Sequence, residues 1–185
     1  DHPLEKLRQK AWQHYLSLGL PSRHNEAYRY IKLRQLYSHD YHLAPGGGTP
    51  SSDRVLECID PECRLSFLVF FNGRFCPDLS NIEGLPSSAA VMPLEQAIST
   101  YGILLNNHWV KSFKEESDPF VALNGALHEA GVFLYLPPKC SIEAPVQIIN
   151  IIDCSEAPCM MFPRLQVFVG AQANVRLIHT QKVIT

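Results

Sequence analysis

The last third of the chain carries the pattern that most restricts its fold. From residue 132 onward, short apolar stretches at 132–136, 146–152, 165–169 and 175–180 alternate with turns of small, polar and proline residues. The stretches begin roughly ten to fifteen residues apart, which is typical of a β-solenoid or a β-sandwich. Because no strict sequence repeat accompanies this spacing, the pattern alone leaves both folds open.

The beginning of the chain has a helical pattern instead. Residues 3–18 place apolar side chains at helical spacing, and Gly19 is positioned to end the helix. A second helical segment is expected to start near Asn25 and to end before Pro45. Residues 46–52 contain three glycines and two serines, so they predict a linker. No Gly-Lys-Ser/Thr follows these glycines, which excludes a phosphate-binding loop of that type.

The middle of the chain mixes strand and helix signals. Residues 65–71 are strand-like, and the Asn-Gly pair at 72–73 predicts a tight hairpin turn because both positions favour a positive φ. A short helix is expected over 93–101, closed by a glycine. The Asp-Pro pair at 118–119 provides an N-cap and a first-turn proline for a further helix, which should stop by Gly131.

The composition indicates a globular chain with protein partners. Hydrophobic residues make up 46% of the 185 residues, and the 16 Lys and Arg are balanced by 18 Asp and Glu without a long run of like charge. This distribution argues against nucleic-acid binding, and the longest apolar runs are too short to span a membrane. The N-terminus shows no secretory signal, and six cysteines in a chain of this size suit reduced thiols. We therefore expect a cytoplasmic protein.

The cysteines do not follow a metal-binding pattern. They form two Cys-x4-Cys pairs and no Cys-x2-Cys, the tighter spacing that is common in structural zinc sites. We therefore interpret the cysteines as ordinary thiols. Cys154 and Cys159 flank a loop, and no obvious charge near them would activate either thiol. The six positions are Cys58, Cys63, Cys76, Cys140, Cys154 and Cys159.

No other constellation supports catalysis. His39 and His42 would share a face if they lay on a helix, but they supply two metal ligands at most, and Glu115 and Glu116 are adjacent and more suited to solvating a loop. No Gly-x-Ser-x-Gly is present. The sequence therefore assigns no catalytic, cofactor-binding or metal-binding residue. Four further histidines stand alone in the sequence: His24, His108, His128 and His179.

Three groups of motifs, in the same order along the chain, resemble the SufB/SufD family of the SUF iron–sulfur cluster assembly system. The first comprises Trp-Gln-His-Tyr-Leu at 12–16 and Gly-Leu-Pro-Ser-Arg-His-Asn-Glu-Ala-Tyr-Arg-Tyr at 19–30, followed by Leu33. The second is Val-Phe-Phe-Asn-Gly-Arg-Phe at 69–75. The third includes Asn-Gly-Ala-Leu at 124–127, Gly-Val-Phe at 131–133, Leu-Pro at 136–137 and Ile-Glu-Ala-Pro-Val-Gln-Ile at 142–148, with Arg164 and Gly170 beyond it. Since the cysteine-rich N-terminal motif of SufB-type chains is absent, the likeness is greater to SufD.

The resemblance implies an α+β, mainly β fold. It predicts a helical N-terminal domain followed by the first part of a right-handed parallel β-helix. With the residue patterns above, it divides the chain into a helical segment at 1–44, a linker at 45–54, a mixed α/β region at 55–130 and the start of a β-helix core at 131–185.

The resemblance also implies a function without catalysis. Such a chain would be the N-terminal part of a scaffold subunit that works with a SufB-like scaffold and a SufC-like ATPase, and it would carry no cofactor of its own. The iron–sulfur cluster would be assembled by the whole complex, with its ligands outside these residues. Unpaired strand edges predict in addition that the isolated chain forms a homodimer.

Two other functions remain open. A β-solenoid enzyme acting on polysaccharide should present clustered acidic and basic side chains on one face, and the predicted strands carry few of them. An autonomous metal or redox protein would use the cysteines and histidines named above.

Overall fold

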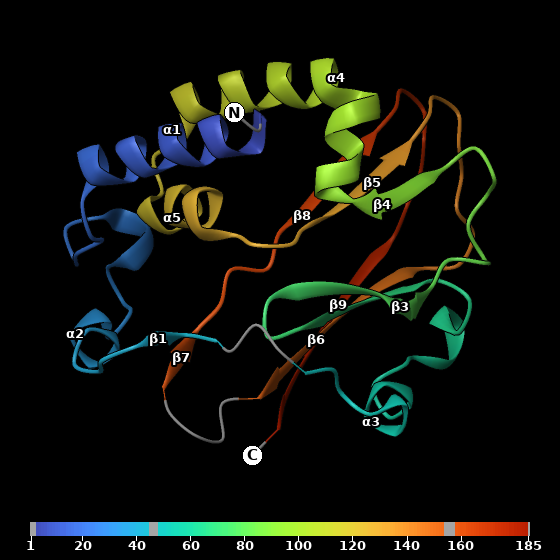
Figure 1. Ribbon diagram of the computed structural model, residues 1–185, viewed down its shortest axis with the longest axis horizontal. Coiled ribbons are helices and arrows are strands. Elements are labelled where there is room, and N and C mark those ends of the chain that lie inside the picture. Colours follow the sequence, from blue (N-terminus) through green and yellow to red (C-terminus); the bar gives the residue numbers. More distant parts are fainter. Residues whose placement is uncertain (1–2, 45–47, 154–157, 185) are drawn as a thin grey trace.

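The computed structural model describes residues 3–44, 48–153 and 158–184, which form a mixed α+β fold. Figure 1 shows a group of helices on one side of the molecule and β-strands across the rest of it. The helical group consists of α1 (Pro3–Leu18), α4 (Leu94–Glu115) and α5 (Pro119–Leu127).

The ends of two helices follow from their local sequence. Helix α1 ends at the predicted glycine: Gly19 has a φ of 72°, and its amide donates a hydrogen bond of 2.9 Å to the carbonyl of Tyr15. A positive φ is easily adopted by glycine, which has no Cβ. Helix α5 begins at the predicted cap, where the Asp118 side chain accepts a hydrogen bond of 2.8 Å from the Phe120 amide. Both predictions are confirmed.

Helix α4 is longer than the sequence predicted. It continues past the expected end at residue 101, with one non-helical residue, Tyr101 (φ −114°, ψ 19°). Leu105 and Trp109 are buried beyond this kink. Burial of two such side chains outweighs the cost of Gly102 in a helix, which is about 1 kcal/mol.

The segment that follows α1 does not form the single helix expected from Asn25. It contains a 3-10 turn, η1 (Glu26–Tyr28), and a short helix, α2 (Leu33–Leu36), before it enters strand β1 (His42–Leu43). The side chains of Tyr30 and Ile31 are exposed, whereas Leu33 is buried, so the expected helix has no continuous buried face.

The strands of the described residues lie in three sheets. A four-stranded sheet has the order β3-β2-β6-β9, a three-stranded sheet has the order β4-β5-β8, and β1 pairs with β7. The first sheet comprises β2 (Phe67–Phe71), β3 (Arg74–Asn81), β6 (Val146–Asp153) and β9 (Leu177–Ile184). The second comprises β4 (Ala90–Pro93), β5 (Val132–Leu136) and β8 (Leu165–Val169), and β7 is Cys159–Met160.

The hairpin between β2 and β3 has the predicted turn. Asn72 and Gly73 have φ values of 47° and 83°, and Phe71 pairs with Arg74 across the turn. The pair therefore supplies the two positive φ angles that such a turn requires.

Successive side chains of β5 point to opposite faces, so this strand contacts both the four-stranded sheet and the helices. Leu134 and its neighbours on the same face pack against Leu68 and Ile148 of the four-stranded sheet. Phe133 points the other way, toward Leu94 and the helices. On the far face of the four-stranded sheet, a third hydrophobic cluster includes a residue of α3 (Ser52–Leu56), and the 3-10 turn η2 (Pro61–Cys63) precedes β2.

The prediction of a right-handed parallel β-helix is wrong. The described residues form three separate small sheets and no closed solenoid, and antiparallel strands β3 and β4 border the two larger sheets. Strand β2, which was assigned to the region before the supposed core, pairs in parallel with β6, with Phe67 opposite Gln147. The spacing of strands along a sequence gives their lengths and turns, but it does not identify their partners.

Two other predictions concern how the chain is organised. The division at 1–44, 45–54, 55–130 and 131–185 stays a prediction, and residues 45–47 of the proposed linker lie outside the described residues. In the ranges that the structure covers, no helix combines the length and the apolar character needed to cross a bilayer.

Candidate functional site

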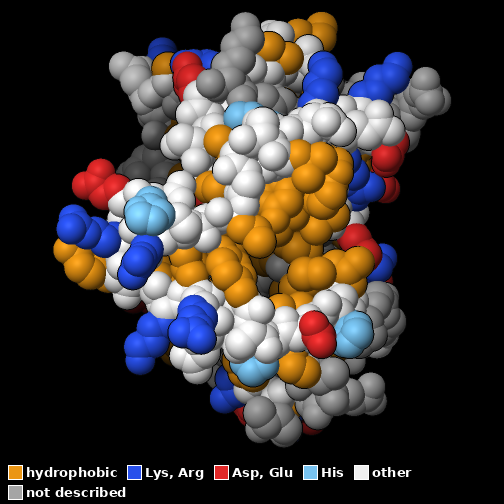
Figure 2. Space-filling model, turned by 90° about the vertical axis from the view of Figure 1, so that its left-hand side faces the viewer, with side chains coloured by type: hydrophobic (Ala, Val, Ile, Leu, Met, Phe, Trp, Pro, Cys, Tyr) orange, Lys and Arg blue, Asp and Glu red, His pale blue; other side chains and the backbone are white. Residues whose placement is uncertain are grey.

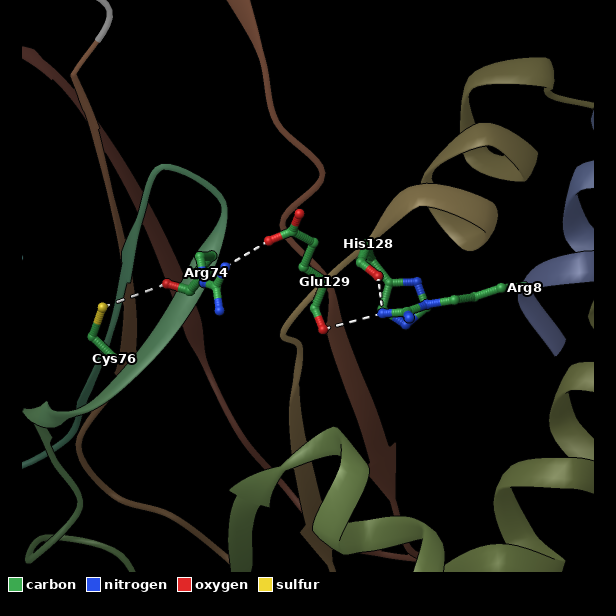
Figure 3. A network of polar contacts seen from close by, with 5 residues as sticks. All are labelled: Arg8, Arg74, Cys76, His128 and Glu129. Carbon is green, nitrogen blue, oxygen red and sulfur yellow. Dashed lines mark hydrogen bonds and ion pairs between the residues drawn. The ribbon is translucent and has the colours of Figure 1, made fainter. Parts of the chain in front are cut away.

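A polar junction connects α1, α5 and the β2–β3 hairpin (Figure 3). The Arg8 guanidinium of α1 donates through Nη2 to the carbonyl oxygens of His128 and, at 3.1 Å, of Glu129, both just beyond α5. The Glu129 carboxylate in turn forms an ion pair of 2.7 Å with Nη1 of Arg74 in β3. Side chains from distant parts of the sequence thus meet at residues 128 and 129.

His128 is the buried centre of this junction, with 3% of its surface exposed. Its Nδ1 lies 3.2 Å from the carbonyl oxygen of Asn124 and 3.1 Å from that of Gly125. Both partners are acceptors, so Nδ1 carries the proton. Burial, and then the positive charges of Arg164 and Arg8, lower the pKa of His128 to about 4, and the ring is therefore neutral at neutral pH.

Arg164 connects the junction to the three-stranded sheet. Its Nη1 donates to Oδ1 of Asn124 at 3.1 Å, and Nδ2 of Asn124 donates to the carbonyl of Pro163 at 2.9 Å. The carbonyl of Arg164 accepts from the amide of Val132 at 3.0 Å, where β5 begins. A Cβ at Gly131 would lie 3.0 Å from that carbonyl oxygen, so a larger residue there would need the neighbouring backbone to shift by a few tenths of an ångström. Burial lowers the pKa of Arg164.

A groove of about 410 Å³ opens beside this junction, between α1 and the end of α5. The nitrogen atoms Nε of Arg8, Nε2 of His128 and Nε of Arg164 are buried without a hydrogen-bond partner in the described part of the chain. The hydrogen bonds of Arg8 and the ion pair of Glu129 hold α1 and the end of α5 against β3. The residues that line the groove are Glu5, Arg8, Gln9, Trp12, Gln13, Ala126, Leu127, His128 and Glu129.

The cysteines are dispersed. Cys58, Cys63, Cys76 and Cys140 are free thiols, and burial raises the pKa of the first three, which keeps them protonated. Cys159 is disulfide-bonded, contrary to the expectation of reduced thiols. Cys154 lies outside the described residues.

The histidines are also dispersed. His39 and His42 lie after α2 and not on a helix, so the shared face on which their pairing was argued does not exist. His24 is exposed, His108 lies 3.3 Å from the Ser112 hydroxyl, and His179 lies 2.6 Å from the Asn150 amide. Across the described ranges, no three His, Cys, Asp or Glu side chains are placed to share a metal ion.

The adjacent acidic residues have separate surroundings. The Glu116 carboxylate accepts a hydrogen bond of 2.7 Å from the Asp118 amide, beside the N-cap of α5, whereas Glu115 is exposed at the end of α4. Glu116 therefore helps to shape the turn between the two helices.

Sequence reasoning missed most of the junction. His128 was noted as an isolated histidine and Arg164 as part of a family motif, but neither Arg8 nor Glu129 carried a signal. The contacts of Arg8 span 120 residues of sequence, so no local pattern predicts them. A histidine directly after the apolar helix α5 was the one available clue.

The fold and the junction define an α+β module whose buried polar groups hold its layers together. Residues 1–148 match the family described as the SufBD protein N-terminal region. The chain belongs to this SufB/SufD family, as its motifs indicated.

Two curated relatives carry the same family description. An iron–sulfur cluster assembly SufBD family protein of Synechocystis is 26% identical over 185 residues, which are 100% of this chain and 40% of the relative. A protein of the same description from Pyrococcus horikoshii is 25% identical over 88 residues, or 48% of this chain and 19% of the relative. The chain therefore spans less than half the length of the relatives it matches.

Proposed function

We propose that this chain is the N-terminal part of a SufD-like, non-catalytic scaffold subunit in cytoplasmic iron–sulfur cluster assembly. The observation that carries the proposal is the family match over residues 1–148, extended to the whole chain by the relative from Synechocystis. The motif at residues 12–30, which resembles that of SufD-type chains, supports a SufD-like rather than a SufB-like chain.

The proposed partners are a SufB-like scaffold and a SufC-like ATPase. The iron–sulfur cluster is the product of the complex, and none of the described residues is proposed as its ligand. The neutral His128 and the raised thiol pKa values of Cys58, Cys63 and Cys76 support a structural role for these groups.

Co-expression tests this proposal. The tagged full-length protein is produced anaerobically with untagged SufB-like and SufC-like partners, and the purified material is measured by native mass spectrometry and assayed for iron and sulfide. We expect one complex that contains all three chains. Parallel preparations omit one partner at a time, which shows whether each contact is direct.

A matched pair of variants relates the result to the fold. Phe133→Asp places a charge in the core between the helices and β5 and should abolish assembly, whereas Val169→Asp changes a half-exposed edge position and should leave the chain folded. Recovery of the tagged protein alone, with the partners present and soluble, would contradict the proposal.

A further inference from the structure

Large hydrophobic side chains gather on the surface of the segment between α1 and β1. Tyr30 is 90% exposed, and the others are exposed as well. They lie on a part of the chain that is mostly turns and single helical turns, and Figure 2 shows the side of the molecule that carries α2, with hydrophobic side chains beside Lys and Arg. Exposed apolar surface of this kind commonly marks a contact surface. The exposed hydrophobic residues are Leu20, Tyr30, Ile31, Leu36 and Tyr37.

A groove of about 1030 Å³ runs through this segment. One wall begins at Pro21 and the other is formed by residues 31–38. The Tyr37 hydroxyl donates a hydrogen bond of 2.7 Å to the Pro21 carbonyl and so connects the two walls. Leu33 is the buried residue among those that line the second wall. The hydrogen bond between Tyr37 and Pro21 fixes the two walls relative to each other.

The charge of the groove is positive. Arg23, Lys32 and Arg34 line it, and no Asp or Glu is among its lining residues. All three cations are exposed, and none of them has an ion pair within the described ranges. The whole chain has a formal net charge of −2, so this local excess does not reflect a basic protein.

We propose that this groove binds an acidic segment of a partner protein. Its carboxylates would pair with Arg23, Lys32 and Arg34, for which charge-assisted hydrogen bonds to carboxylate are favourable. An apolar side chain of the same segment would cover Ile31 and Tyr37. A nucleic acid is a weaker candidate, because the chain has 16 Lys and Arg against 18 Asp and Glu and so lacks the basic excess typical of nucleic-acid-binding proteins.

Fluorescence anisotropy with a defined probe tests the proposal. The probe is a fluorescein-labelled ten-residue peptide of Asp and Glu with two Leu and one Phe, and its control replaces every acidic residue by Asn or Gln. The full-length protein should bind the acidic peptide at least tenfold more tightly than the control peptide. Binding should weaken as salt is raised, because exposed ion pairs are screened.

Matched variants locate the binding. R23Q/K32Q/R34Q should weaken binding about tenfold, since each exposed charge pair contributes modestly. R54Q/R64Q/K182Q removes the same charge from exposed residues elsewhere and should change affinity less than twofold. Ile31→Ser should weaken binding several-fold without altering charge, which separates recognition from simple attraction between opposite charges.

Several results would overturn the proposal. Equal loss in the two triple variants would show unspecific attraction, and an unchanged affinity of Ile31→Ser would remove the apolar contact. Tighter binding of a ten-nucleotide single strand, competing with the peptide, would assign the groove to nucleic acid. A complete lack of peptide binding would contradict the proposal, and a homodimer that dissociates in R23Q/K32Q/R34Q would assign the groove to a second copy of this chain.

Discussion

Acid should destabilise this fold through one residue, His128. In the folded chain its ring is buried and neutral, and burial with the nearby Arg164 and Arg8 lowers its pKa from 6.5 to about 4. After unfolding, the ring returns to water and takes up a proton near its ordinary pKa. The unfolded state therefore binds more protons, and the stability that His128 contributes is fully present above pH 6.5 and is lost as the pH falls toward 4.

The size of the effect follows from the shift. Each pH unit between the two pKa values costs about 1.4 kcal/mol of unfolding free energy. Relative to pH 7, we expect a loss of about 2 kcal/mol at pH 5 and about 3 kcal/mol at pH 4. This is a large part of a typical stability of about 5–15 kcal/mol.

His128→Asn isolates this contribution. The asparagine amide can donate to the carbonyls of Asn124 and Gly125 as Nδ1 does, but it does not titrate. Urea unfolding, followed by circular dichroism at several pH values, should give a flatter dependence of unfolding free energy on pH for this variant. His24→Asn removes an exposed histidine and serves as the control. Parallel curves for the wild type and His128→Asn would refute the reasoning.

Two further changes test the packing. Phe133→Ala removes a fully buried ring that contacts three aromatic rings. It should lower the unfolding free energy by about 3–5 kcal/mol in urea titrations. Val169→Ala changes an exposed position and should lower the unfolding free energy by less than about 1 kcal/mol. Gly170→Ala would place a Cβ 2.5 Å from the Pro138 nitrogen, so the thermal midpoint of this variant should fall by several degrees. Gly102→Ala has open space around the new Cβ and lies in a helix, so its thermal midpoint should rise. The opposite order of the two midpoints would contradict the structure.

The sequence predicted correctly those elements whose pattern is formed entirely by neighbouring residues. The strand at 132–136 alternates between two buried faces and was found with the same bounds, and the Asp-Pro pair at 118–119 capped its helix as expected. The single helix expected after Asn25 did not form, because helical spacing of apolar residues predicts a buried face only where another element covers it. Tyr30 lies in solvent instead.

The features that depend on distant contacts could not be predicted. The pairing of β2 with β6 joins residues 80 positions apart, such as Phe67 and Gln147, and no strand pattern contains that information. The same limit applies to the junction, where Arg8 reaches His128 across 120 residues. The family motifs pointed to Arg164 and to residues 124–127, but they gave neither the neighbours nor the charge state of these groups.

The contact between α1 and the chain after α5 has a consequence for synthesis on the ribosome. Helix α1 is made before its partner groups, because the carbonyls that accept from Arg8 follow 120 and 121 residues later. At about 5–20 residues per second, the nascent helix waits on the order of 6–24 seconds before its docking surface exists. During this interval its apolar face, including the later-buried Leu4 and Ala11, is available to chaperones.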